Sequence, residues 1–148
     1  MKESGTRNKT ERGKVGMNGE NDTPLMILVV EDVAETRDGI EKLLKAHGYR
    51  VAVARDERDA IESVQRQHPA LILVSLAGLP SEVIVTARRI RERGAVGEDV
   101  PVVLFCIDEI GEGDEVAIGR NVHVTRPDNF NQLRRLLTRL LPNISKAA

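Results

Sequence analysis

The sequence contains few of the residues that indicate secretion, membrane insertion or base stacking. Cys106 is the one cysteine in 148 residues, so no internal disulfide can form, and no segment resembles a signal peptide. No apolar run approaches the ~18 residues of a membrane-spanning helix. Tryptophan is absent and aromatic residues make up 2% of the chain, which disfavours nucleic-acid binding by aromatic stacking. These absences favour a cytoplasmic protein with an aliphatic core.

The chain also lacks an excess of either charge. Lys and Arg number 22 and Asp and Glu 23, for a net charge of −1, whereas nucleic-acid-binding domains usually carry a clear basic excess. Arginines nevertheless gather in two expected helices. We interpret them as solvated outer faces, with an acidic protein partner as the sharper alternative. They are Arg88, Arg89, Arg91, Arg93, Arg134, Arg135 and Arg139.

The chain divides into a polar start and one domain. Residues 1–24 are polar, mix both charge signs and lack periodic hydrophobic positions, so we expect a disordered tail there. Residues 25–142 are long enough for one domain with its own core, and 143–148 form a short tail. We therefore expect a single domain between two short tails.

Short apolar runs alternate with helix-period segments throughout this domain. Strands are expected at 26–30, 51–54, 71–75, 101–106 and 121–125. Asp56, Ser81 and Asp128 precede three of the helical segments as candidate N-caps. Between the fourth and fifth strands the signal is poor, and we expect at most a brief helix over 114–118.

Strict alternation of strand and helix predicts an α/β fold with a doubly wound, five-stranded parallel sheet. In such folds ligands bind outside the carboxyl ends of the strands. The residues at those ends are expected around one crevice. They are Glu31, Asp32, Ser75, Cys106 and Arg126.

The adjacent acids Glu31 and Asp32 allow two interpretations. A divalent metal ion with oxygen ligands would stabilise two neighbouring carboxylates. Alternatively, the two acids lie in a solvated loop and favour the N-terminus of the helix that begins near Val33.

Over about 118 residues this layout resembles the receiver domain of bacterial response regulators. The resemblance implies a flavodoxin-like sheet with strand order 2-1-3-4-5. It also implies that Glu31 and Asp32 correspond to the family's magnesium site. The acceptor aspartate of the family, at the end of the third strand, corresponds here to Ser75.

Other positions of the family's site also differ in this chain. The Thr or Ser after the fourth strand corresponds to Cys106, the Lys-Pro pair after the fifth to Arg126 and Pro127, and the aromatic switch residue to His123. A serine needs a general base to attack phosphorus, and a cysteine is only a weak hydrogen-bond donor. Because a guanidinium can grip a carboxylate with two donors, we expect Arg126 to lie across an acid of the pair. Magnesium is then expected to bind weakly or not at all.

The resemblance therefore implies a stand-alone atypical receiver, or pseudo-receiver, without an output domain, that acts in two-component phosphorelay signalling. We expect this domain not to be an enzyme and to need no cofactor. We expect it to bind a histidine kinase, another regulator or a second copy through its fourth and fifth strands and last helix. Two alternatives remain open: phosphorylation at another acid, Asp32 or Asp108, and a small-molecule sensor that uses the altered crevice. DNA binding through the arginine-bearing helices has little support from the charge.

Overall fold

The computed structural model describes residues 24–105, 111, 113–126 and 129–141. The expected tails lie outside these residues, apart from Pro24. The elements follow in the order β2 (Met26–Glu31), α1 (Ala34–Ala46), β3 (Arg50–Ala54), α2 (Glu57–Arg66), β4 (Leu71–Ser75), α3 (Pro80–Arg93), β5 (Val102–Phe105), β6 (Glu115–Ala117), β7 (Val122–Thr125) and α4 (Phe130–Leu140).

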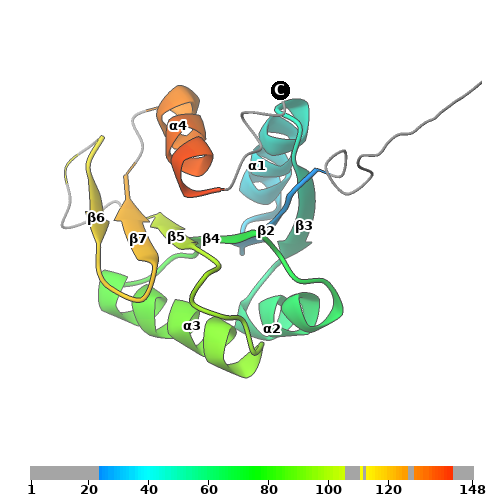
Figure 1. Ribbon diagram of the computed structural model, residues 1–148, viewed down its shortest axis with the longest axis vertical. Helices are drawn as coiled ribbons and strands as arrows, with labels where there is room; N and C mark the ends of the chain where they lie inside the picture. Colours follow the sequence, from blue (N-terminus) through cyan, green and yellow to red (C-terminus); the bar gives the residue numbers. More distant parts are fainter. Residues whose placement is uncertain (1–23, 106–110, 112, 127–128, 142–148) are drawn as a thin grey trace, which may run out of the picture.

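The strands form one sheet in the order β3-β2-β4-β5-β7-β6. The first five are mutually parallel, and in chain order their arrangement is 2-1-3-4-5. The predicted flavodoxin-like α/β fold is therefore confirmed. Figure 1 shows α1 and α4 on one face of the sheet and α2 and α3 on the other.

Each face of the sheet has its own aliphatic core because the apolar strands alternate their side chains between two layers of helices. On the α2 and α3 face, Leu28 and Ile72 lie in one cluster with Ile90 of α3. On the α1 and α4 face, Val29 and Leu73 cluster with helix residues that include Leu44. Burial on both faces explains why the strands read as continuous apolar runs.

The expected brief helix over 114–118 is wrong. Glu115–Ala117 forms β6, which pairs antiparallel with β7 at the edge of the sheet. The two strands are joined by a tight turn in which Gly119, Arg120 and Asn121 all have positive φ. A segment this short cannot stabilise a helix by itself, whereas the neighbouring strand offers ready backbone partners. The described chain therefore has a sixth, antiparallel strand in addition to the predicted five.

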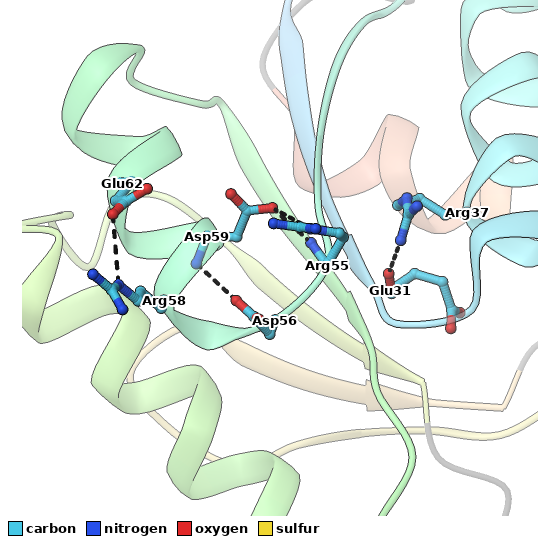
Figure 2. Close-up of polar contacts among 7 residues, drawn as sticks. All are labelled: Glu31, Arg37, Arg55, Asp56, Arg58, Asp59 and Glu62. Atoms are coloured by element: carbon cyan, nitrogen blue, oxygen red, sulfur yellow. Dashed lines mark hydrogen bonds and ion pairs between the residues drawn. The ribbon is translucent and has the colours of Figure 1, made fainter.

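The three predicted N-caps have different outcomes. Asp56 caps α2, accepting a hydrogen bond from the Asp59 backbone N–H at 2.9 Å (Figure 2). Ser81 does not cap α3, whose N-cap is Leu79, two residues earlier, because Pro80 has a φ suited to the first helical position. The N-cap of α4 is Asn129, so Asp128, which lies outside the described residues, is not the cap.

The arginines of α3 are not all solvated, contrary to our interpretation. Arg91 is only 7% exposed, and its guanidinium donates to the backbone carbonyls of Val100 at 2.7 Å and Arg120 at 2.5 Å. It thereby ties α3 to the turn between β6 and β7. Arg89 donates two hydrogen bonds to Glu57 of α2, and this contact holds the pKa of Glu57 below its usual value.

Candidate functional site

The carboxyl ends of β2, β4, β5 and β7 meet at one cavity of about 590 Å³. Glu31, Asp32, Ser75 and Arg126 line this cavity together, so their predicted convergence is confirmed. Cys106, Pro127 and Asp108 lie outside the described residues. The described polar residues of the site therefore come from the ends of β2, β4 and β7, and β5 contributes the apolar Leu104 and Phe105.

Ser75 and Glu31 form the central contact of the site. They are register partners on the adjacent parallel strands β4 and β2, so their side chains leave the same edge of the sheet. The Ser75 Oγ–H donates to Glu31 Oε1 at 2.7 Å. Glu31 is only 4% exposed, and a buried carboxylate needs such donors to offset its lost hydration. The serine hydroxyl is thereby committed to a neighbour in its own sheet.

The rest of Glu31 is also held by the start of α1. Its Oε2 accepts a hydrogen bond from the backbone N–H of Val33 at 3.0 Å, and Val33 is the N-cap residue of α1. Arg37 of the same helix donates to the backbone carbonyl of Glu31 at 2.8 Å (Figure 2). Glu31 therefore interacts with the N-terminus of α1 as the alternative interpretation expects, but it lies buried at the end of β2 and not in a solvated loop.

Asp32 and Arg126 behave differently from Glu31. Asp32 is exposed at the mouth of the cavity. Arg126 follows β7 and lines the same cavity. Among ion pairs whose two members are both described, none joins Arg126 to Glu31 or Asp32. The expected contact of Arg126 with the acidic pair is therefore not among the ion pairs of the described residues, and Glu31 is held by Ser75 and Val33 instead.

His123 lies in β7, beside Val103 of β5 and Ala117 of β6. Its Nε2–H donates to Asn121 Oδ1 at 2.8 Å, and Asn121 in turn donates to the Glu98 backbone carbonyl. Burial lowers the pKa of His123, an effect that Glu115 opposes and Arg139 reinforces. The residue that the resemblance assigns to the switch position is thus a partly buried imidazole held in the β6 and β7 hairpin.

Sequence reasoning missed the apolar wall of the cavity. Leu76, Val83, Ile84, Leu104 and Val124 all line it. Three of them, Val83, Leu104 and Val124, belong to the core between the sheet and α3. In the sequence, each of these residues lies in an apolar segment that predicts only a buried core position. The packing of α3 against the sheet shows that part of this core borders the cavity.

An open parallel sheet with helices on both faces and a polar site at its strand ends defines the flavodoxin-like class of domains. Within this class, a family model described as the response regulator receiver domain matches residues 27–138. The chain therefore belongs to the response regulator receiver family.

Individual relatives support this assignment. The chain is 27% identical over 128 residues to the response regulator MprA of Mycolicibacterium vanbaalenii, a match that covers 81% of this chain and 53% of that protein. The receiver domain of a sensor histidine kinase from Pseudomonas aeruginosa PAO1, solved with magnesium in its active-site cleft, is 26% identical with a TM-score of 0.58, covering 80% and 98% of the two chains. A receiver domain of a histidine kinase from Syntrophus aciditrophicus aligns with a TM-score of 0.61 at 18% identity, covering 82% and 93%.

The chain spans about half the length of MprA and of several other curated relatives that it matches. None of the helices in the described part of the chain combines the length and apolar character that a membrane crossing requires.

The residues present do not fit the magnesium site that the family implies. A divalent ion there needs several oxygen ligands free to turn toward it. Glu31 is engaged on both oxygens, and Ser75 supplies only a hydroxyl at the position that the resemblance assigns to the acceptor carboxylate. Among the described residues, no three acidic, histidine or cysteine side chains converge as a metal site. Of the two described acids that line the cavity, only Asp32 is left, and one carboxylate is too little to hold the ion.

Proposed function

We propose that this domain acts in two-component signalling as a phosphorylation-independent receiver, which binds a protein partner without accepting a phosphoryl group. The observation that carries this proposal is the hydrogen bond from Ser75 to the buried Glu31. It uses the side chain at the acceptor position as a structural donor.

The chemistry of phosphoryl transfer supports the same proposal. An aspartate acceptor is ionised at neutral pH and attacks phosphorus directly, whereas a serine must first lose its proton. Glu31 accepts the hydrogen bond from the Ser75 hydroxyl. Its negative charge, together with that of Asp32, would however repel an incoming phosphoryl group. Arg126 is the one cation at the described rim of the cavity, and catalysis of phosphoryl transfer depends on concentrated positive charge.

The proposed docking surface comprises β6, β7 and the outer side of α4. It includes the half-buried His123 and the exposed Arg135 and Arg139, and Arg139 forms an ion pair with Glu115 of β6. Exposed arginines on this surface favour an acidic patch on the partner, because a guanidinium pairs well with carboxylates. We propose a histidine kinase, another regulator or a second copy of the chain as the partner.

The first test is the intact mass of the protein after incubation with acetyl phosphate and magnesium. The natural chain is expected to gain no phosphoryl group. Ser75→Asp serves as the positive comparison because it restores the acceptor, and Ser75→Asn serves as its uncharged, nearly isosteric control. Modification of Ser75→Asp alone would show that the missing carboxylate is the main defect of the site.

A phosphoryl group on the natural chain would overturn the proposal. Mapping that group would then decide between Ser75 and the alternative acceptors Asp32 and Asp108. If neither the natural chain nor Ser75→Asp is modified, the altered surroundings, including Arg126, also disable the site.

Docking is tested by the affinity for purified candidate kinases and regulators, measured with and without acetyl phosphate. We expect the affinity to be independent of the phosphodonor and to fall for Arg135→Glu. Arg66→Glu, an exposed arginine at the end of α2, is the matched control from the opposite layer. Equal losses for both variants would exclude the proposed surface.

A further inference from the structure

The cavity at the strand ends has two chemically distinct parts. Its inner wall is apolar and includes Leu76, Ile84 and Leu104. Its charged lining residues are the exposed Asp32, the buried Glu31 and the half-buried Arg126. A volume of about 590 Å³ falls within the range of about 300–1,000 Å³ for pockets that bind small organic ligands.

The apolar wall is continuous with a core of the domain. Val83, Leu104 and Val124 are each at most 7% exposed and belong to the cluster beneath α3. Side chains of a core that border open space lose dispersion contacts on that side. A ligand with an apolar body would restore those contacts.

The polar groups at the mouth favour a cation over an anion. The Ser75 hydroxyl donates to Glu31, and the Thr125 hydroxyl donates to the backbone carbonyl of Asp114 at 3.2 Å. Both side-chain hydroxyls are therefore already used as donors within the protein. Among the described residues that line the cavity, two carboxylates and one guanidinium give a net charge of −1, and Asp32 is the exposed carboxylate.

We propose that this cavity binds a small amphipathic amine, whose apolar body lies against α3 and the ends of β5 and β7 and whose ammonium group lies at Asp32. This binding does not depend on the proposed protein docking, which uses a different surface. It gives the altered crevice a ligand of opposite charge to the phosphoryl group that the family's site receives.

The test uses three probes with one apolar body and different head groups: 4-phenylbutylamine, 4-phenylbutan-1-ol and 4-phenylbutyrate. Each is titrated into the uniformly ¹⁵N-labelled full chain, and backbone amide shifts are followed by NMR. The amine is expected to shift the amides of Leu76, Gly78 and Ile84 saturably. An exposed ion pair contributes about 1 kcal/mol, so we expect the amine to bind about fivefold more tightly than the alcohol.

Two variants locate the binding. Asp32→Asn is expected to remove the preference for the amine, whereas Asp38→Asn, an exposed acid on α1, should leave it unchanged. Ile84→Trp should abolish the shifts by filling the apolar part, with a cooperative thermal transition as the check that this variant is folded.

Three results would overturn the proposal. They are the absence of saturable shifts with every probe, equal or tighter binding of the carboxylate, and amine binding that survives both Asp32→Asn and a folded Ile84→Trp. Because none of these measurements involves a phosphodonor or a protein partner, they fail or succeed separately from the proposed function.

Discussion

At the scale of single residues, Ser75 has a structural task as well as a place in a divergent site. Its hydroxyl stabilises a carboxylate that is almost wholly buried, and hydrogen bonds to charged groups contribute more than neutral ones. Replacing this serine should therefore lower the stability of the fold, independently of any role of Ser75 in signalling.

Ser75→Ala is expected to lower the free energy of unfolding by about 1.5–3 kcal/mol, because Glu31 keeps only its bond from the Val33 backbone. Urea denaturation followed by circular dichroism measures this change. Ser81→Ala, at an exposed position in the first turn of α3, should change stability little. Similar values for both variants would show that the hydroxyl does not hold Glu31.

His123 predicts a specific dependence of stability on pH. Burial lowers its pKa in the folded protein, so below its ordinary pKa of 6.5 the unfolded chain binds a proton that the folded chain does not. The stability contributed by the neutral imidazole is thus complete above that pH. It is lost as the pH falls from about 6.5 toward the folded pKa, with a slope of at most about 1.4 kcal/mol per pH unit.

His123→Gln should remove this part of the slope when unfolding free energies are measured between neutral and mildly acidic pH. His68→Gln, an exposed histidine after α2, is the control. If the natural chain and His123→Gln lose stability in parallel, His123 does not titrate as its burial requires.

Residue positions at the site could be predicted from the sequence, but their partners could not. The convergence of Glu31, Asp32, Ser75 and Arg126 follows from the rule that parallel strands end at one edge. The bond between Ser75 and Glu31 depends on the register of β2 against β4, which joins residues 44 positions apart. The expected contact of Arg126 failed for the same reason, because local charge rules do not show which donor reaches the buried acid.

At the scale of secondary structure elements, Arg91 is the main tie between α3 and the hairpin of β6 and β7. Its guanidinium replaces the water that the backbone carbonyls of Val100 and Arg120 would otherwise need, and it makes a longer contact of 3.4 Å to the Asn121 carbonyl, which also accepts from the Val102 N–H. Burial lowers the pKa of Arg91, but its usual value is so high that the group stays charged at neutral pH.

Arg91→Met keeps the apolar stem and removes these donors, so it should lower the free energy of unfolding by about 2–4 kcal/mol. It should also speed amide hydrogen exchange in the turn that contains Arg120 and Asn121. Arg88→Met, an exposed position on the same helix, should have little effect on either measurement. Equal effects of the two variants would mean that the hydrogen bonds of Arg91 to the backbone carbonyls do not contribute to stability.

The elements that sequence reasoning identified correctly are those whose signal lies within their own residues. The apolar runs of β2 and β4 and the cap of Asp56 are examples. The strand β6 carries no such signal, because its three residues are exposed and its state is decided by pairing with β7. Arg91 was misjudged similarly, since its acceptors are carbonyls that come from two different loops.

At the scale of the whole molecule, the two cores share one sheet and should therefore unfold together. Tyr49 is the one tyrosine and the chain has no tryptophan, so intrinsic fluorescence reports on the core beneath α1 and α4, where Tyr49 lies. Ile90 lies in the other core.

Ile90→Ala should lower stability by about 2–5 kcal/mol and should shift the Tyr49 fluorescence transition and the circular dichroism transition by the same amount of urea. This coincidence is the mark of a two-state domain. Leu44→Ala, in the core that contains Tyr49, should likewise shift both transitions by the same amount of urea. A fluorescence transition left unmoved by Ile90→Ala would show that the two faces unfold separately.

The antiparallel strand at the end of the sheet also affects how the molecule behaves when it is crowded. An open strand edge is a template on which further copies can add without limit, which leads to polymers and aggregates. At this edge (Figure 1) the last strand is only three residues long, and its Glu115 is paired with Arg139 of α4. An edge that is this short and charged offers few backbone groups on which another strand could add. We therefore expect association at this edge to stop at discrete complexes and not to continue into polymers, even at high protein concentration.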